Sequence, residues 1–161
     1  MRRIRKKFKN PRMSWDSDNI AERRNTMNNY GLRRRKEILI AQEILRSFRR
    51  RARELIAEKD DKKMKTLLEK MVKLGLLKSE QGLDDVLALN LNNILDRRLQ
   101  TIVWKLGLAT TPKQSRQFIT HCHVTVEGKI VKSPAYIVRI SEESKIGLNI
   151  STNKVVGDGK G

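Results

Sequence analysis

Several residue types are scarce in this sequence, and each shortage excludes a class of protein. Cys122 is the single cysteine among 161 residues, which excludes an internal disulfide and a zinc site built from several cysteines. The thiol content gives no reason to place the protein outside a reducing compartment. Apolar runs stop at four residues, as in residues 38–41, so none is long enough to span a membrane. The basic start leads into polar residues, and we expect no signal peptide.

Aromatic residues and catalytic motifs are also scarce. Two Trp, two Tyr and three Phe leave little material for extended platforms on which bases stack. The sequence has no glycine-rich phosphate loop, no H-E-x-x-H or G-x-S-x-G motif and no readable pair of catalytic carboxylates. These absences predict a protein that is not an enzyme and that uses no cofactor.

Acidic residues are half as frequent as basic ones. The chain has 36 Lys and Arg against 18 Asp and Glu, so its net charge is +18. This excess predicts a polyanionic partner, although charge alone does not separate nucleic acid from a membrane surface. Residues 1–59 carry 19 basic and 7 acidic side chains, residues 60–95 carry 6 of each, and residues 96–161 carry 11 and 5. Two basic regions around a neutral spacer favour specific contacts over a merely solvated basic surface.

The first 13 residues are the most basic segment, with seven Lys or Arg and no acid. Such a segment repels itself and has too little apolar surface to fold alone. We therefore expect a basic arm that becomes ordered on phosphates; a disordered tail or a localisation signal is the alternative. The expected RNA contacts of the arm are Arg2, Arg3, Arg5, Lys6, Lys7 and Lys9.

A long amphipathic helix is predicted over residues 32–58. Its apolar positions recur every three or four residues, which is the helical period; they are Ile38, Ala41, Leu45, Phe48, Ala52 and Leu55. Four arginines follow the same period on another stripe, and we expect them to contact phosphates: Arg46, Arg49, Arg50 and Arg53. Ion pairs with Glu43 and Glu54 on the same helix, or a solvated face, are the alternative.

The remaining patterns predict an α+β protein: a helical N-terminal region followed by a small helix–helix–β-hairpin module. Thr111 is expected to cap a helix with Pro112 in its first position. The other expected helices begin after a cap at Ser17 or Asp18 and cover about 61–74, 83–89 and 91–106. The expected strands are 124–126 and 129–131, joined as a hairpin, then 136–140 and 146–150. The organisation is a basic arm (1–13), a helical region (14–95), the module (96–150) and a flexible tail (151–161).

The order of residues in the module resembles a known family. Residues 95–99 read LDRRL, residues 106–109 read LGLA, residues 113–119 read KQSRQFI, and residues 124–131 read VTVEGKIV. This order resembles the RNA-binding module first described in small-subunit ribosomal protein four, which ends in a V-x-V-x-G-x-x-V hairpin. The resemblance fixes about a dozen positions over residues 96–138.

The rest of the chain resembles the archaeal-type branch of that ribosomal protein family. The stretches that carry this resemblance include WD at 15–16, YGL at 30–32, KLGLL at 73–77 and LDDVL at 83–87. Bacterial members often carry a zinc-binding cysteine cluster near the N-terminus, and this sequence has none. His121 and His123 alone do not complete a tetrahedral site, so we expect no metal, and we expect Cys122 to be a small buried apolar group.

The resemblance implies that the module helices face RNA. Lys113 and Arg116 lie one turn apart near a helix N-terminus, where free N–H groups favour phosphate, and arginine can bind phosphate with two hydrogen bonds. Three alternatives stay open: an ion pair of Arg98 with Asp96 or another acid, a capping role for Gln114, and a structural His121. The implied RNA contacts are Arg97, Arg98, Lys113, Gln114, Arg116 and His121.

The function implied by the resemblance is that of a structural component of the small ribosomal subunit in the cytoplasm. The implied partners are small-subunit (16S-type) rRNA and ribosomal proteins five and twelve of the same subunit, with no membrane. Roles in early assembly and in decoding accuracy are implied as well. The alternatives are an enzyme or enzyme subunit that uses the module to hold RNA, and a free-standing DNA or membrane-surface binder that acts through charge alone.

Overall fold

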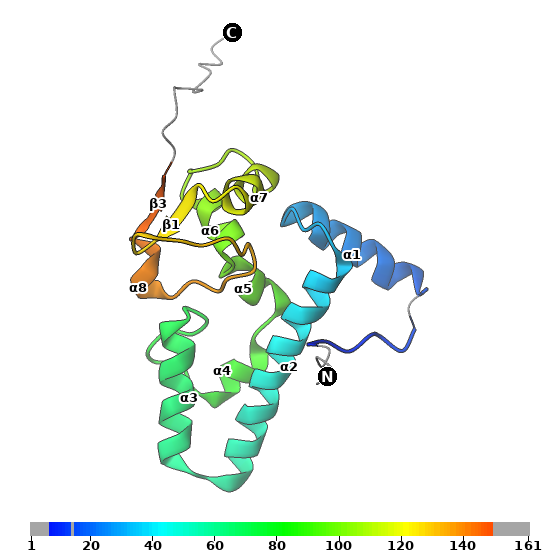
Figure 1. The fold of residues 1–161 in the computed structure, drawn as a ribbon. Helices are drawn as coiled ribbons and strands as arrows, with labels where there is room; N and C mark the ends of the chain where they lie inside the picture. Colours follow the sequence, from blue (N-terminus) through cyan, green and yellow to red (C-terminus); the bar gives the residue numbers. More distant parts are fainter. Residues whose placement is uncertain (1–6, 14, 150–161) are drawn as a thin grey trace, which may run out of the picture.

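A computed structural model describes residues 7–13 and 15–149. Figure 1 shows a helical half, in which α2 and α3 extend together away from a smaller half that holds a short sheet. The elements in chain order are α1 (Ser17–Asn29), α2 (Arg35–Glu58), α3 (Asp61–Lys73), α4 (Leu83–Ala88), α5 (Leu91–Asp96), α6 (Leu99–Lys105), α7 (Pro112–Thr120), β1 (Val124–Val126), β2 (Lys129–Ile130), α8 (Ile140–Glu143) and β3 (Ile146–Leu148).

The helical half is built around α2. Its apolar stripe is buried as predicted, with Ile38 and Ala52 at most 1% exposed, and it packs against α1, α3, α4 and α5. Figure 1 shows α3 running beside the lower part of α2, and the two helices are in contact. The helix ends at Lys59, which takes the left-handed conformation with φ 53°, and this reversal directs α3 back along α2.

The module packs two helices against a three-stranded antiparallel sheet. The strand order is β2–β1–β3, with Val126 opposite Lys129 on one side and Ile146 on the other. The hairpin is therefore confirmed, and the strand expected near 146–150 forms as β3. The module has a core of its own, made of Leu99, Ile102, Val103, Ala109, Ile119, Val124, Val126 and Val138.

Two expected elements are wrong, and both errors have one cause. The helix expected over 91–106 is interrupted at Arg97–Arg98, where Arg98 is extended (φ −73°, ψ 141°). The strand expected at 136–140 forms a single bridge, Arg98 to Ile137, and the chain then enters α8. Leu99 N donates to Tyr136 O at 2.7 Å, and Val138 N donates to Arg97 O at 3.0 Å. The two irregular segments thus satisfy each other's backbone polar groups, which neither could do alone.

Smaller expectations also have clear outcomes. The cap of α1 is Asp16, not Ser17 or Asp18, because its carboxylate accepts from Asp18 N. The start of α7 is confirmed: Pro112 lies in its first turn, and the Thr111 side chain accepts from Gln114 N. Leu106, the last residue of the helix expected over 91–106, is 46% exposed, and α6 ends one residue earlier. Among the described helices, none has the length and apolar character required to cross a membrane.

Outside the described residues lie Arg2, Arg3, Arg5, Lys6 and the 151–161 tail.

The two halves are tightly packed where Gly31 meets the start of α7. Gly31 follows α1 with φ +58°, a conformation that favours glycine. A Cβ atom at this position would lie 2.8 Å from Pro112 Cβ and 3.1 Å from the backbone N of Lys113. The glycine therefore serves both the turn and the packing of the module against α1.

We predict that Gly31→Ala destabilises the protein by about 3 kcal/mol, through left-handed strain and a backbone clash. Gly107→Ala is the matched control, because Gly107 has φ +73° and open space around it, so only the strain of about 1 kcal/mol remains. Urea unfolding of both variants gives the two values. Equal destabilisation would show that the contact with Pro112 contributes nothing.

Candidate RNA-binding surface

A three-residue ion-pair cluster joins the two halves. Glu37 Oε2 in α2 accepts from Arg98 Nη2 at 2.6 Å and from Arg116 Nη1 at 3.0 Å. The side chains of Arg98, Glu37 and Arg116 are 5%, 15% and 24% exposed. Two guanidinium groups of the module therefore meet one carboxylate of the helical half, largely out of water.

Local structure holds Glu37 in place for this contact. Glu37 lies in the first turn of α2, where its other oxygen, Oε1, accepts from the backbone N–H groups of Arg33 and Arg34 at 3.3 Å each. Burial alone would raise the pKa of Glu37, but hydrogen bonds from Arg116 and Arg98 and their charges outweigh burial, so the pKa is lowered. The carboxylate stays ionised at neutral pH with both oxygens used.

Arg98 therefore has the ion pair that the sequence left open, with Glu37 as its partner instead of Asp96. The break between α5 and α6 turns Arg98, one of the implied RNA contacts, inward to 4% exposure. Asp96 has other partners: it pairs with Lys105 Nζ at 3.0 Å and accepts from the Tyr30 hydroxyl at 3.3 Å.

Arg97 is held on the opposite side of the same break. Its Nη1 donates to Glu143 at 2.9 Å and its Nη2 to Val138 O at 3.1 Å, and the side chain is 15% exposed. A Cβ atom added to Gly75 would lie 2.9 Å from Arg97 Cζ. Arg97 thus fills a tight space where the end of α3 meets α8.

Gln100 is a joining residue that sequence reasoning missed. It is 1% exposed, and its Nε2 lies within hydrogen-bond distance of the carbonyl oxygens of Tyr30, Gly31 and Pro112, at 2.9–3.1 Å. The signal was a polar residue on the apolar face of a helix, where burial without partners would be costly. Carbonyl oxygens from both halves of the protein satisfy that need.

The remaining module residues stay near the surface. Lys113 and His121 are exposed, and the His121 ring stacks on that of His123 with centroids 6.3 Å apart. Gln114 Oε1 accepts from Thr110 N and Thr110 Oγ1 at 2.7 and 2.6 Å, one residue before the N-cap Thr111. This contact agrees with a structural role for Gln114 at the start of α7. Cys122 is half-buried with φ +67°, so it is less buried than expected. The described residues hold no group of three or more side chains suited to a metal.

The arginine stripe of α2 forms one wall of a groove. A cavity of about 650 Å³ is lined by Arg46, Arg49, Arg50 and Arg53 together with Gln42, Leu45 and Leu91. Arg46 pairs with Glu43 at 2.6 Å and Arg50 with Glu54 at 3.5 Å, as the sequence allowed, yet both arginines are at least 60% exposed. Arg49 is half-buried and donates to Leu89 O at 2.5 Å. We name this the arginine groove.

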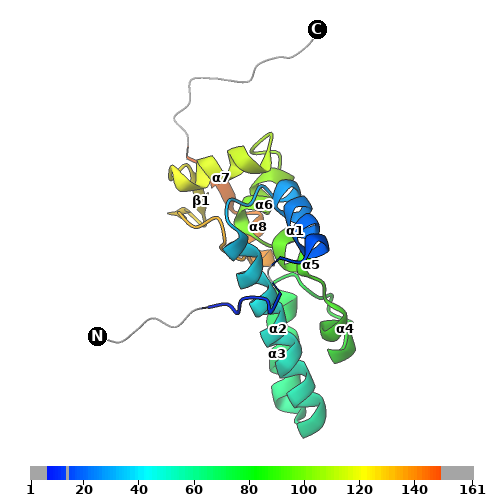
Figure 2. The ribbon, with the colours of Figure 1, turned by 90° about the vertical axis from the view of Figure 1, so that its right-hand side faces the viewer.

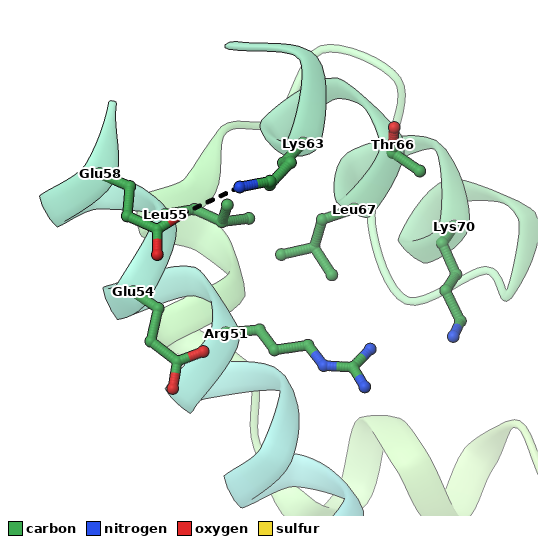
Figure 3. A pocket seen from close by; sticks show the side chains of 8 residues that line it. All are labelled: Arg51, Glu54, Leu55, Glu58, Lys63, Thr66, Leu67 and Lys70. Atoms are coloured by element: carbon green, nitrogen blue, oxygen red, sulfur yellow. Dashed lines mark hydrogen bonds and ion pairs between the residues drawn. The ribbon is translucent and has the colours of Figure 1, made fainter. Parts of the chain in front are cut away.

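A second cavity, between α2 and α3, has mixed charge. Figure 3 shows Arg51 and Lys63 reaching across it, with Lys63 Nζ 3.5 Å from Glu58. Glu54 also lines this space of about 530 Å³. Carboxylates beside the cations make it a poorer phosphate site than the arginine groove.

Comparison with known proteins decides the family. The S4 domain model matches residues 97–144. A small ribosomal subunit protein uS4 from Ignicoccus hospitalis is 45% identical over 149 residues, which cover 91% of this chain and 90% of that protein. The chain belongs to the uS4 family. The uS4 proteins of Saccharolobus solfataricus and Methanococcus aeolicus are 43% and 45% identical, covering 94% and 90% of this chain and 86% and 84% of their own lengths.

The family assignment confirms several predictions made from the sequence. The resemblance to ribosomal protein four, the α+β class with a helical region before the RNA-binding module, and a ribosomal protein in place of an enzyme all hold. The S4 domain match begins at Arg97, which is also where the structure separates α5 from α6. The break between α5 and α6, beside the joint where Glu37 meets Arg98 and Arg116, therefore coincides with the start of the matched region.

We predict that Glu37→Gln destabilises the free protein by about 3 kcal/mol, because it leaves the buried Arg98 charge without its partner. Glu43→Gln is the matched control on the same helix, since its pair with Arg46 is exposed and is worth at most about 0.5 kcal/mol. Urea unfolding at neutral pH measures both. A Glu37→Gln effect as small as that of the control would contradict the role of the cluster.

The lowered pKa of Glu37 also predicts how this difference depends on pH. Folding lowers the pKa below the ordinary value of 4.5, so the stabilisation is complete above that value and is lost as pH falls through the folded pKa. The gap in unfolding free energy between wild type and Glu37→Gln should therefore shrink as pH falls from neutral to below the ordinary pKa of 4.5. Urea unfolding across this range measures the gap, and a constant gap would contradict the ion-pair account.

Proposed function

We propose that this chain holds folded small-subunit rRNA through exposed cations, while its buried arginines keep the two halves in register. The support is the uS4 family membership, the S4 domain and the net charge of +18. The arginine groove is the observation that carries the proposal, because it presents several guanidinium groups along one helix at fixed spacing. Duplex and junction RNA is recognised mainly by shape and phosphates, which suits a rigid basic surface.

The residues expected to contact RNA divide into two groups in this proposal. Arg97, Arg98 and Arg116 are engaged with Glu143 or Glu37, and we assign them to the joint. The exposed group supplies the phosphate contacts, because an unburied cation can reach an RNA backbone without leaving a buried partner unpaired. Arg46 and Arg50 do pair with Glu43 and Glu54, but these pairs are exposed and therefore weak. It comprises Arg46, Arg50, Arg53, Lys113 and His121, with Arg49 contributing one edge of the groove.

The start of α7 is the second phosphate site in this proposal. Lys113 is exposed beside the first N–H groups of a nine-residue helix, where the helix dipole favours an anion. The exposed Lys129 and Lys132 follow on and after the hairpin. In this proposal Gln114 holds the start of α7 in place through Thr110. It therefore supports the RNA contact of this helix end without binding phosphate itself.

The basic arm is the third part of the proposed surface. In its described portion Lys7 and Lys9 are exposed, and Lys36 Nζ lies 5.4 Å from the centre of the Phe8 ring. This contact places the portion beside the N-terminal end of α2, near Arg35. The charges of Arg2, Arg3, Arg5 and Lys6 would extend the same surface along an rRNA backbone.

We also infer, from the family resemblance alone, a place in the cytoplasmic ribosome beside ribosomal proteins five and twelve, with roles in early assembly and decoding accuracy. Chemical cross-linking of assembled small subunits tests the two neighbours. Co-sedimentation with the small subunit in high salt tests the proposed function itself, because a binder held by charge alone would dissociate.

We predict that Arg50→Gln together with Arg53→Gln weakens binding to small-subunit rRNA without loss of stability. Each phosphate contact that the double variant loses should reduce the slope of log affinity against log salt by about 0.7–0.9. The exposed Lys62→Gln and Lys65→Gln pair on α3 is the control of equal charge change. Filter binding at several salt concentrations, with thermal melts, measures both. Wild-type affinity in a folded groove variant would contradict the proposed surface.

A further inference from the structure

A second groove continues from the arginine groove and is lined by different chemistry. Its volume is about 690 Å³, and residues of α1, α2, α5 and α6 line it; Gln42 and Leu91 belong to both grooves. Figures 1 and 2 both show α1 beside the N-terminal end of α2, close to α5 and α6. We call it the amide groove.

Five side-chain amides line this groove, and all are exposed: Asn25, Asn29, Gln42, Asn90 and Asn92. Asn90 occupies the N-cap of α5 yet makes no capping hydrogen bond with its side chain, although asparagine commonly caps at that position. Each amide offers donors and an acceptor close together. This combination matches the edge of a nucleobase, which presents donors and acceptors in the same plane.

Two further residues suit a planar, uncharged ligand. Arg23 also lines the groove, and its Nη1 is buried with no hydrogen-bond partner among the described residues. A buried guanidinium nitrogen without an acceptor is costly, and a carbonyl oxygen of a ligand that displaced the atoms covering it would satisfy it. Trp104 lines the groove with 38% of its surface exposed, and RNA-binding proteins stack unpaired bases on such rings.

Two carboxylates line the groove: Glu22 is exposed, and Asp96 is neutralised by an ion pair. Asp96 pairs with Lys105 and accepts from Tyr30. Burial and Asp96 raise the pKa of Tyr30 to about 12, so the phenol stays protonated and neutral. The amide groove is therefore suited to the base of a nucleotide, and the neighbouring arginine groove is suited to its phosphates.

We propose that an unpaired nucleobase of small-subunit rRNA enters the amide groove while the adjoining backbone lies on the arginine groove. This inference rests on the proposed function and adds a recognition site to it. The base hydrogen-bonds with the amides and with Arg23, and it packs against Trp104. The site would read a base that has left the helical stack, which phosphate contacts alone cannot do.

The first test compares two double variants that differ only in which amides they remove. Asn29→Ala with Asn92→Ala removes groove amides, whereas Asn28→Ala with Asn93→Ala removes their neighbours on the same helices. We expect the groove pair to weaken binding to small-subunit rRNA about 10-fold with an unchanged salt slope, because every phosphate contact remains. The control pair should bind like wild type.

The second test observes the base directly. In a Trp15→Phe chain, Trp104 is the single tryptophan, and stacking of a base on its ring should quench its fluorescence when rRNA binds. Adding Asn29→Ala and Asn92→Ala should reduce that quenching at saturating rRNA. A Trp104→Phe chain, which reports Trp15 alone, is the control.

The outcomes separate the two proposals. If the wild-type chain binds rRNA but the groove pair binds like its control and Trp104 emission does not change, the amide groove does not receive a base while the proposed function stands. A groove that takes a protein segment would give this same result. If the wild-type chain fails to bind rRNA, both proposals are overturned.

Discussion

The contact of Glu37 with Arg98 and Arg116 is the interaction on which the rest of the structure depends. One carboxylate from the helical half meets two guanidinium groups of the module at 2.6 and 3.0 Å, and Gln100 bonds to both halves beside it. Because these groups are largely buried, neither half could keep them satisfied alone. The joint therefore sets the position of α2 relative to α7, and with it the spacing of the basic surfaces.

This arrangement separates two uses of arginine in one basic protein. Arginines with an acidic partner out of water, such as Arg97 and Arg98, join segments that are distant in sequence. Arginines on the outer face of α2, such as Arg50 and Arg53, remain exposed. A net charge of +18 is thus partly structural, and only the exposed fraction is available to a polyanion.

The two adjoining grooves extend this division to recognition. The arginine groove presents charge, and the amide groove presents neutral hydrogen-bonding groups beside Arg23 and Trp104. Phosphates are the same along any RNA, whereas unpaired bases mark particular places in a folded one. A surface that combines both chemistries can bind strongly through charge and still select a position.

Local patterns in the sequence were sufficient for much of this protein. The period of the apolar residues predicted α2 and its buried stripe, Thr111 and Pro112 predicted the start of α7, and the motif order predicted the family and the hairpin. These features depend on neighbours within a few residues, so a single sequence reveals them. The role of Arg98 was different, because Glu37 lies 61 residues away and the break between α5 and α6 exists only where residues 136–138 satisfy its backbone. Tertiary packing decided which arginines stay exposed and which amides gather around Trp104. The reason is that burial and pairing depend on segments that lie far apart in the sequence.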